Sequence, residues 1–76
     1  MNAEFTYILV PSTSHALRIE KHLAAAGITC KLVPVPRHLS SDCGVCVRLA
    51  PPDRRAAETL LLQQALDYDQ VVNTSP

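Results

Sequence analysis

Two segments with helical periodicity separate four short β-rich runs in this chain, and their order constrains the fold more than any other feature. The β-rich runs cover residues 5–10, 28–35, 45–49 and 70–73. Apolar residues recur at three- and four-residue spacing over 15–26 and 57–66, which is the period of an amphipathic helix. The order β-α-β-β-α-β is typical of a split βαβ domain of the ferredoxin-like class.

This order predicts an α+β fold, in which a four-stranded antiparallel sheet carries two helices on one face. Right-handed crossovers place the runs at 5–10 and 45–49 in the centre of the sheet and the other two runs at its edges. The opposite sheet face is then either open or covered by a second subunit, so a homodimer is one prediction. We expect a single domain over residues 1–76, with flexible ends at 1–4 and 74–76.

The boundaries of these elements carry local signals. The Ser-Thr-Ser run at 12–14 offers hydroxyl oxygens that can cap the first helix, and Gly27 suits the left-handed position after its end. Two prolines within 34–36 cannot donate to a strand ladder, which favours an edge position for the run 28–35.

Charge and length exclude several classes of protein. The formal net charge is zero, so no basic surface indicates a nucleic-acid or membrane partner, and little opposes self-association. The apolar run 5–10 is too short for a signal peptide or a membrane span, and we expect a cytoplasmic protein. In that compartment three cysteines indicate packing, metal or redox roles more than a disulfide framework.

The predicted topology brings two distant segments together. The first two strands run parallel, so their carboxyl ends lie at the same sheet edge, where the first helix also begins. Residues 12–15 should therefore lie beside the loop 37–46, which contains the sequence Ser-Ser-Asp-Cys-Gly-Val-Cys.

Cys43 in this loop is a candidate nucleophile. It follows polar residues and precedes Gly44, so the loop is expected to be exposed, although free cysteines are often buried and inert. The thiolate is the nucleophile, and helix N–H groups and neighbouring cations stabilise it. Candidates for that role are the 12–15 turn, Arg37, Arg48, His15 and His38, whereas Asp42 opposes a second negative charge.

Cys43 and Cys46 form a C-x-x-C pair with two further interpretations. A structural zinc site needs four ligands, and no second C-x-x-C or H-x₃₋₅-H motif is present to supply the other two. Only His15 and His38 could complete the site, so we predict no metal site. As a dithiol pair it lies between a loop and a strand, where the two side chains point apart unless Gly44 bends the chain. Cys46 is then a half-buried residue of the sheet.

The remaining candidates are most simply structural. The hydroxyls at 12–14 are expected to cap the helix, although the same N–H groups can hold an anion. Packing or surface positions are expected for Cys30, His22, Arg54 and Arg55.

Two blocks of the chain resemble the small bacterial family of putative Se/S carrier proteins. One is the strand and helix opening that ends in Pro-Ser-Thr-Ser-His-Ala at 11–16, and the other is Pro-Arg-His-Leu-Ser-Ser-Asp-Cys-Gly at 36–44. The resemblance covers nearly the whole chain. It implies that Cys43 carries a sulfur or selenium atom, with Arg37, Ser40, Ser41, Gly44 and Arg48 as motif neighbours. Cys46 departs from the family pattern, either as a resolving thiol or as an incidental substitution.

The resemblance therefore implies a carrier that holds a persulfide or selenide on Cys43 and passes it to a partner. Such transfer is not turnover of a small molecule, and it needs no cofactor. The implied partners are a sulfur or selenium donor, such as a cysteine desulfurase, and an acceptor protein; the zero net charge predicts no nucleic-acid or membrane partner. The binding residues would include Ser12, Thr13, Ser14 and His15. The alternative is an interaction or regulatory module in which Cys43 and Cys46 form a redox or metal-binding pair.

Overall fold

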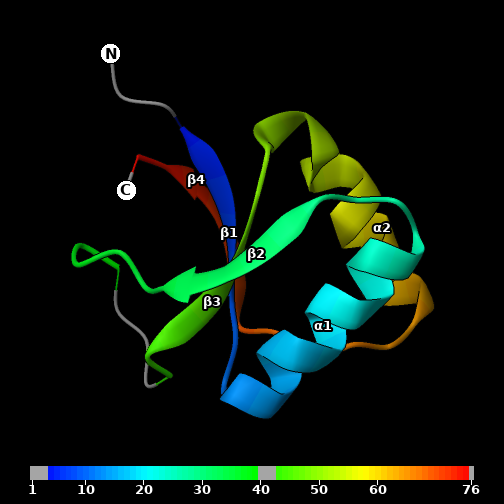
Figure 1. Ribbon diagram of the computed structural model, residues 1–76, viewed down its shortest axis with the longest axis horizontal. Helices are drawn as coiled ribbons and strands as arrows, with labels where there is room; N and C mark the ends of the chain where they lie inside the picture. Colours follow the sequence, from blue (N-terminus) through cyan, green and yellow to red (C-terminus); the bar gives the residue numbers. More distant parts are fainter. Residues whose placement is uncertain (1–3, 40–42, 76) are drawn as a thin grey trace.

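The computed structural model describes residues 4–39 and 43–75, which form one antiparallel sheet with two helices on one face (Figure 1). The elements are β1 (Phe5–Leu9), α1 (Thr13–Ala25), β2 (Cys30–Pro34), β3 (Val45–Leu49), a 3₁₀ turn (Pro51–Asp53), α2 (Arg54–Gln63) and β4 (Gln70–Thr74). The strand order is β2-β3-β1-β4, and each neighbouring pair is antiparallel. The predicted ferredoxin-like order, with β1 and β3 in the centre, is confirmed.

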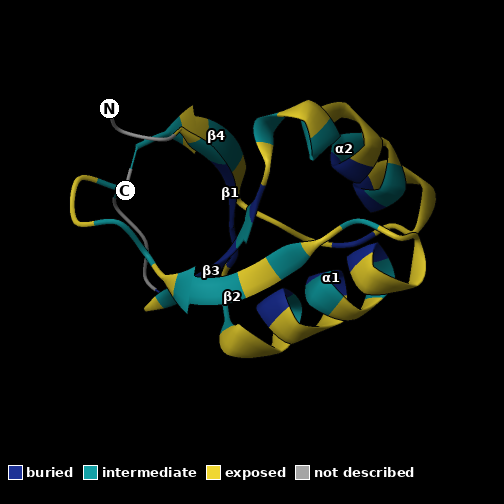
Figure 2. Ribbon diagram, turned by 45° about the horizontal axis from the view of Figure 1, so that its top comes forward, coloured by how far each residue is buried: buried dark blue, intermediate teal, exposed yellow. Residues whose placement is uncertain are grey.

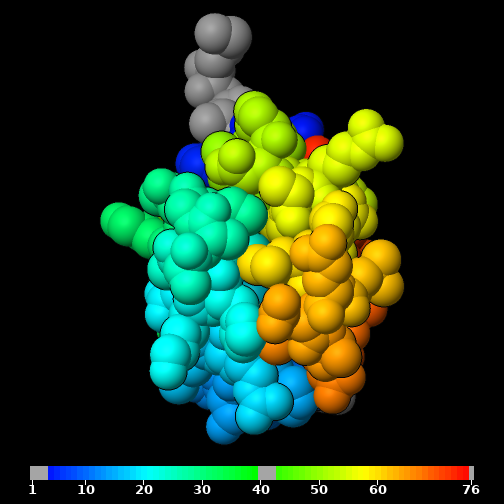
Figure 3. Space-filling view, turned by 90° about the vertical axis from the view of Figure 1, so that its right-hand side faces the viewer, coloured from blue at the N-terminus to red at the C-terminus, as the bar shows by residue number. Residues whose placement is uncertain are grey.

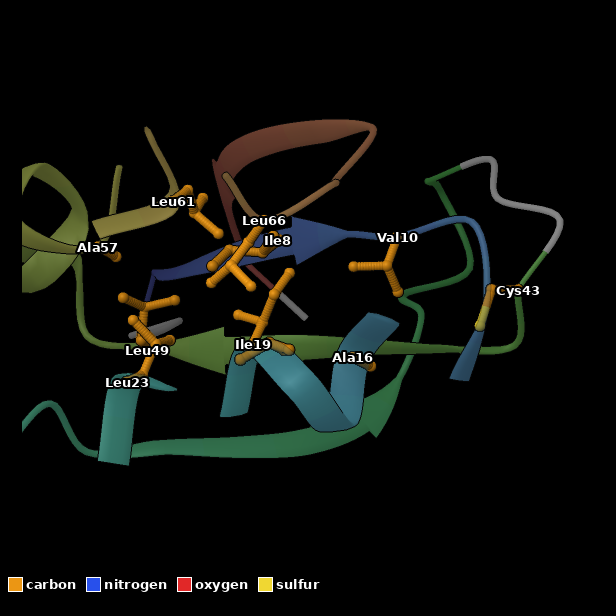
Figure 4. Packing of buried hydrophobic residues seen from close by; sticks show 11 residues of the cluster. Ile8, Val10, Ala16, Ile19, Leu23, Cys43, Leu49, Ala57, Leu61 and Leu66 are labelled. Carbon is orange, nitrogen blue, oxygen red and sulfur yellow. The ribbon is translucent and has the colours of Figure 1, made fainter. Parts of the chain in front are cut away.

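Alternate residues of the two central strands form the core beneath the helices. Ile8 of β1 and Val47 of β3 pack with Ile19 of α1 and Leu61 of α2 in one buried cluster. Figure 4 shows this cluster between the sheet and the helices, with Cys43 at one end of it. We call it the helix-side cluster.

The other sheet face carries no helix, yet its central residues are buried. Tyr7, Leu9 and Cys46 form a second cluster on this face, the helix-free cluster. Val35 and Leu39, from the segment after β2, pack against that cluster. The sequence predicted that this face is open to solvent or covered by a second subunit. In the structure, the chain itself covers part of it.

A hydrogen bond fixes this covering segment to the far edge of the sheet. His38 Nε2 lies 2.9 Å from Thr74 Oγ1 at the end of β4. Figures 1 and 2 show the segment that follows β2 extending past the sheet on the side where β4 ends. Thr74 therefore belongs to the fold, and β4 extends one residue further than the sequence indicated.

Both ends of α1 follow the expected signals. Ser12 is the N-cap, so the helix begins two residues before the predicted His15. Gly27 has a φ of 81°, and the N–H of Ile28 donates to the Leu23 carbonyl over 2.9 Å. This is the Schellman arrangement, in which glycine adopts the left-handed conformation at little cost.

The same arrangement ends α2, but with alanine in the left-handed position. Ala65 has a φ of 50°, and the N–H of Leu66 donates to the Leu61 carbonyl over 2.9 Å. A Cβ atom is unfavourable in this conformation. The buried Leu66 side chain, which packs in the helix-side cluster, offsets that cost.

We therefore expect Ala65→Gly to stabilise the protein by about 0.5–1 kcal/mol, because relief of the strained φ exceeds the added flexibility of the unfolded chain. Urea unfolding measures the change. Gly27→Ala is the matched control and should destabilise the protein. A lower stability of the Ala65→Gly variant would contradict this explanation.

Arg54, which the sequence suggested was a surface charge, joins α2 to the edge strand β4. Its guanidinium donates to Asn73 Oδ1 and to the Val71 carbonyl, both over 3.1 Å, and to Glu58 over 3.2 Å. The same Asn73 oxygen accepts from the buried hydroxyl of Thr6 over 2.7 Å. A single arginine thus connects α2 with β4.

Replacement of Arg54 by alanine should lower the free energy of unfolding by about 1 kcal/mol, since these partly exposed hydrogen bonds are lost. Arg55→Ala, at the neighbouring exposed position, should leave it nearly unchanged. Chemical denaturation of both variants measures the two changes in the free energy of unfolding. Equal changes would show that the hydrogen bonds of Arg54 add no net stability.

Candidate functional site

Cys43 lies where the β2–β3 connection returns to the sheet, beside the first turn of α1. Its Sγ is 3.8 Å from Thr13 Oγ1, and either atom can be the donor of this hydrogen bond. Figure 4 shows the sulfur next to the opening of α1. The predicted proximity of the 12–15 turn and the cysteine loop is confirmed at these two residues.

The Cys43 side chain is buried, with 7% of its surface exposed. It belongs to the helix-side cluster, which also contains Val10 and Ala16. The expectation of an exposed loop thiol is wrong because residue 43 has already turned back to the sheet and completes the core at the end of β1.

A short hydrogen-bonded turn leads into α1. Ser12 Oγ lies 2.6 Å from His15 Nδ1, and the His15 N–H also points to Ser12 Oγ at 3.4 Å. Ser12 therefore acts as the predicted cap and orients the imidazole, which is half-buried. Ser14 is exposed in the same turn.

Arg48, one of the two arginines expected near Cys43, lies elsewhere. The Arg48 guanidinium lies over the Phe5 ring, 4.4 Å from its centroid, on the helix-free face of the sheet. Arg37 is exposed beside His38, whose contact with Thr74 lies near the start of β1 and not near its end. The predicted arginine environment of the thiol is therefore wrong for Arg48. The motif residues Ser40 and Ser41, and Asp42, lie outside the described residues.

Gly44 is exposed and surrounded by open space. A Cβ atom added there would meet no atom within 4 Å, and its φ is not in the left-handed region. The described part of the fold thus gives no steric reason for glycine at this position.

Cys46 occupies a different environment from Cys43. It is 0% exposed and lies in the helix-free cluster, opposite Leu9 of β1 and Val33 of β2. Burial raises the pKa of Cys46 to about 11, the nearby Cys43 thiol adds to this, and Arg48 opposes it. At neutral pH Cys46 is a protonated thiol of the core.

Among the described residues, the remaining candidates do not form a second functional site. Cys30 is half-buried and its thiol donates to the Glu20 carbonyl of α1 over 3.9 Å; burial, and then Glu20, raises the pKa of Cys30. Within residues 4–39 and 43–75, no three side chains of the metal-binding types are grouped to hold an ion. In the same residues, no helix has the length and hydropathy to cross a bilayer.

Sequence reasoning missed two of the contacts that hold the covering segment. The partners in the His38–Thr74 hydrogen bond are 36 residues apart, and no local pattern indicates it. Leu39 follows a proline-rich stretch that resembles an exposed loop, yet it packs on the helix-free cluster. The sequence offered one indication of this packing, namely that Leu39 is an apolar residue.

The Cys46 thiol should make stability fall at alkaline pH. Between about pH 9 and 11 the unfolded chain releases this proton while the folded chain retains it, so the free energy of unfolding decreases as pH rises. The stability difference between wild type and Cys46→Ala should therefore shrink across this window. Urea titrations at pH 8, 9.5 and 11 measure it, and a constant difference would contradict the assignment.

Comparison with known proteins gives one match. A family model described as putative Se/S carrier protein-like matches residues 5–73, which extend from the start of β1 into β4. No curated protein matches the chain, and no solved structure matches it.

Proposed function

Because the chain belongs to the putative Se/S carrier protein-like family, we propose that it carries sulfur or selenium on Cys43 and passes it between partner proteins in the cytoplasm. The observation that carries this proposal is the position of the Cys43 sulfur, 3.8 Å from Thr13 Oγ1 at the opening of α1.

The opening of α1 favours a negative charge near that sulfur. The first N–H groups of a helix and its dipole stabilise anions. The first turn of α1 contains no acidic residue that would oppose this effect. The Thr13 hydroxyl can also donate to a charged sulfur. A persulfide anion on Cys43 would receive both kinds of stabilisation.

The transfer step is a thiol exchange that needs no external oxidant. The Cys43 thiolate attacks the terminal sulfur of a donor persulfide, a new S–S bond forms, and the donor cysteine leaves as a thiolate. The acceptor thiolate then attacks the terminal sulfur on Cys43 and releases Cys43 as a thiolate. Selenium would be carried through an S–Se bond in the same way.

The burial of Cys46 helps to preserve the cargo. A resolving thiol would attack Cys43, release sulfide and leave a disulfide. Cys46 lies in the helix-free cluster whereas Cys43 lies in the helix-side cluster, and its raised pKa keeps it protonated. Neither the geometry nor the protonation state favours the discharge. The same facts disfavour the alternative of a Cys43/Cys46 redox module.

The low exposure of Cys43 implies protection as well as restricted access. A sulfur beneath the first turn of α1 is shielded from small cellular thiols. Loading then requires a local opening at the surface. We therefore propose that a partner protein promotes this opening, and that small sulfur compounds reach Cys43 more slowly, through spontaneous openings.

Mass spectrometry tests the carrier function directly. After incubation with a cysteine desulfurase and cysteine, the protein should gain about 32 Da, the mass of one sulfur atom, on the peptide that contains Cys43. Cys43→Ala should abolish the gain because the acceptor thiol is gone. Cys30→Ala and Cys46→Ala are the matched controls and should retain it.

Two outcomes would contradict the proposal. A gain that persists in Cys43→Ala would assign the chemistry to another cysteine. A loss of two hydrogens shared by Cys43 and Cys46, without a sulfur adduct, would favour the redox module.

A further inference from the structure

The outer side of α1 continues from the Cys43 site along the helix. Thr13, which contacts the Cys43 sulfur, is followed at i+4 by Leu17 and at i+8 by Lys21. Residues at this spacing lie on the same side of a helix, one turn apart. Leu17 and Lys21 therefore lie on the same side of α1 as Thr13, which contacts the Cys43 sulfur.

This part of α1 combines exposed apolar surface with a shallow hollow. Leu17 is 51% exposed, so a large apolar side chain meets solvent one helical turn from the residue that contacts Cys43. The hollow has a volume of about 560 Å³ and is lined by Leu17, Arg18, Lys21, His22 and Ala25. We call these five residues the α1 strip. Figure 3 shows α1 side chains, coloured blue to cyan, at the surface of this face.

The strip is locally basic although the chain has no net charge. Arg18 and Lys21 are both exposed, and among residues 4–39 and 43–75 neither forms an ion pair. Glu20, the acid of the same helix, is half-buried; it lines a neighbouring hollow together with Lys21 and Cys30 and does not line the strip itself. The five residues of the strip therefore include two cations and no acid, which complements an acidic surface.

We propose that the α1 strip docks the protein that donates sulfur to Cys43, through an acidic surface from which an apolar side chain enters the hollow beside Leu17. This inference rests on the proposed carrier function. Charge at the edge of such a contact mainly sets the association rate, and the apolar contact sets the residence time. Docking at the strip would bring the donor within one helical turn of Thr13 and Cys43.

The test compares two routes of loading for each variant. A cysteine desulfurase with cysteine delivers sulfur through a protein contact, whereas inorganic polysulfide delivers it without one. We expect the double variant Arg18→Glu/Lys21→Glu, and separately Leu17→Asp, to slow desulfurase-driven loading of Cys43 at least tenfold. Polysulfide loading should be unchanged. Raised salt should slow wild-type loading by the desulfurase alone, because it screens the charge attraction.

The second helix provides matched controls. Leu62 is 78% exposed and Arg55 is exposed, but both lie on α2 and neither lines the hollow of the strip. Leu62→Asp and Arg55→Glu should load at the wild-type rate by both routes. Circular dichroism of every variant checks that the fold is retained.

Each remaining outcome separates the two proposals. Wild-type loading rates in the strip variants, or equal loss by both routes, would overturn the docking inference and leave the carrier function intact. Failure of wild-type Cys43 to take up sulfur by either route would overturn the carrier function itself.

Discussion

The central strands β1 and β3 are buried on both faces, and the position of every candidate residue depends on this arrangement. The helices cover one face, and the segment 35–39 covers part of the other. In a domain of 76 residues, apolar burial on a single face supplies little stability, so the second layer matters. Val35, Leu39 and Cys43 of the β2–β3 connection are thus part of the packed structure.

This role of the connection explains the position of Cys43. The connection is held at His38, by the end of β4, and again at Cys43, by the start of α1. Leu39 packs on the helix-free cluster, whereas Cys43 packs on the helix-side cluster beside the opening of α1. The burial of Cys43 and its contact with Thr13 both follow from this position.

The order of elements could be predicted because it depends on local signals. The proline after β1, the hydroxyl run before α1 and Gly27 after it each act within a few residues, and alternation in β3 assigned Cys46 and Arg48 to one face. The site was less predictable. Burial of Cys43 and the contact of Arg48 with Phe5 depend on residues that are distant in sequence. Ala65 was missed because a left-handed alanine has no sequence signature of its own.

The location of the two cysteines on opposite faces has a chemical consequence. Cys43 packs in the helix-side cluster and Cys46 in the helix-free cluster, although Cys43 is near enough to contribute to the raised pKa of Cys46. A thiol that stays neutral at physiological pH is a poor nucleophile. Packing within the sheet is therefore the role that the structure supports for Cys46.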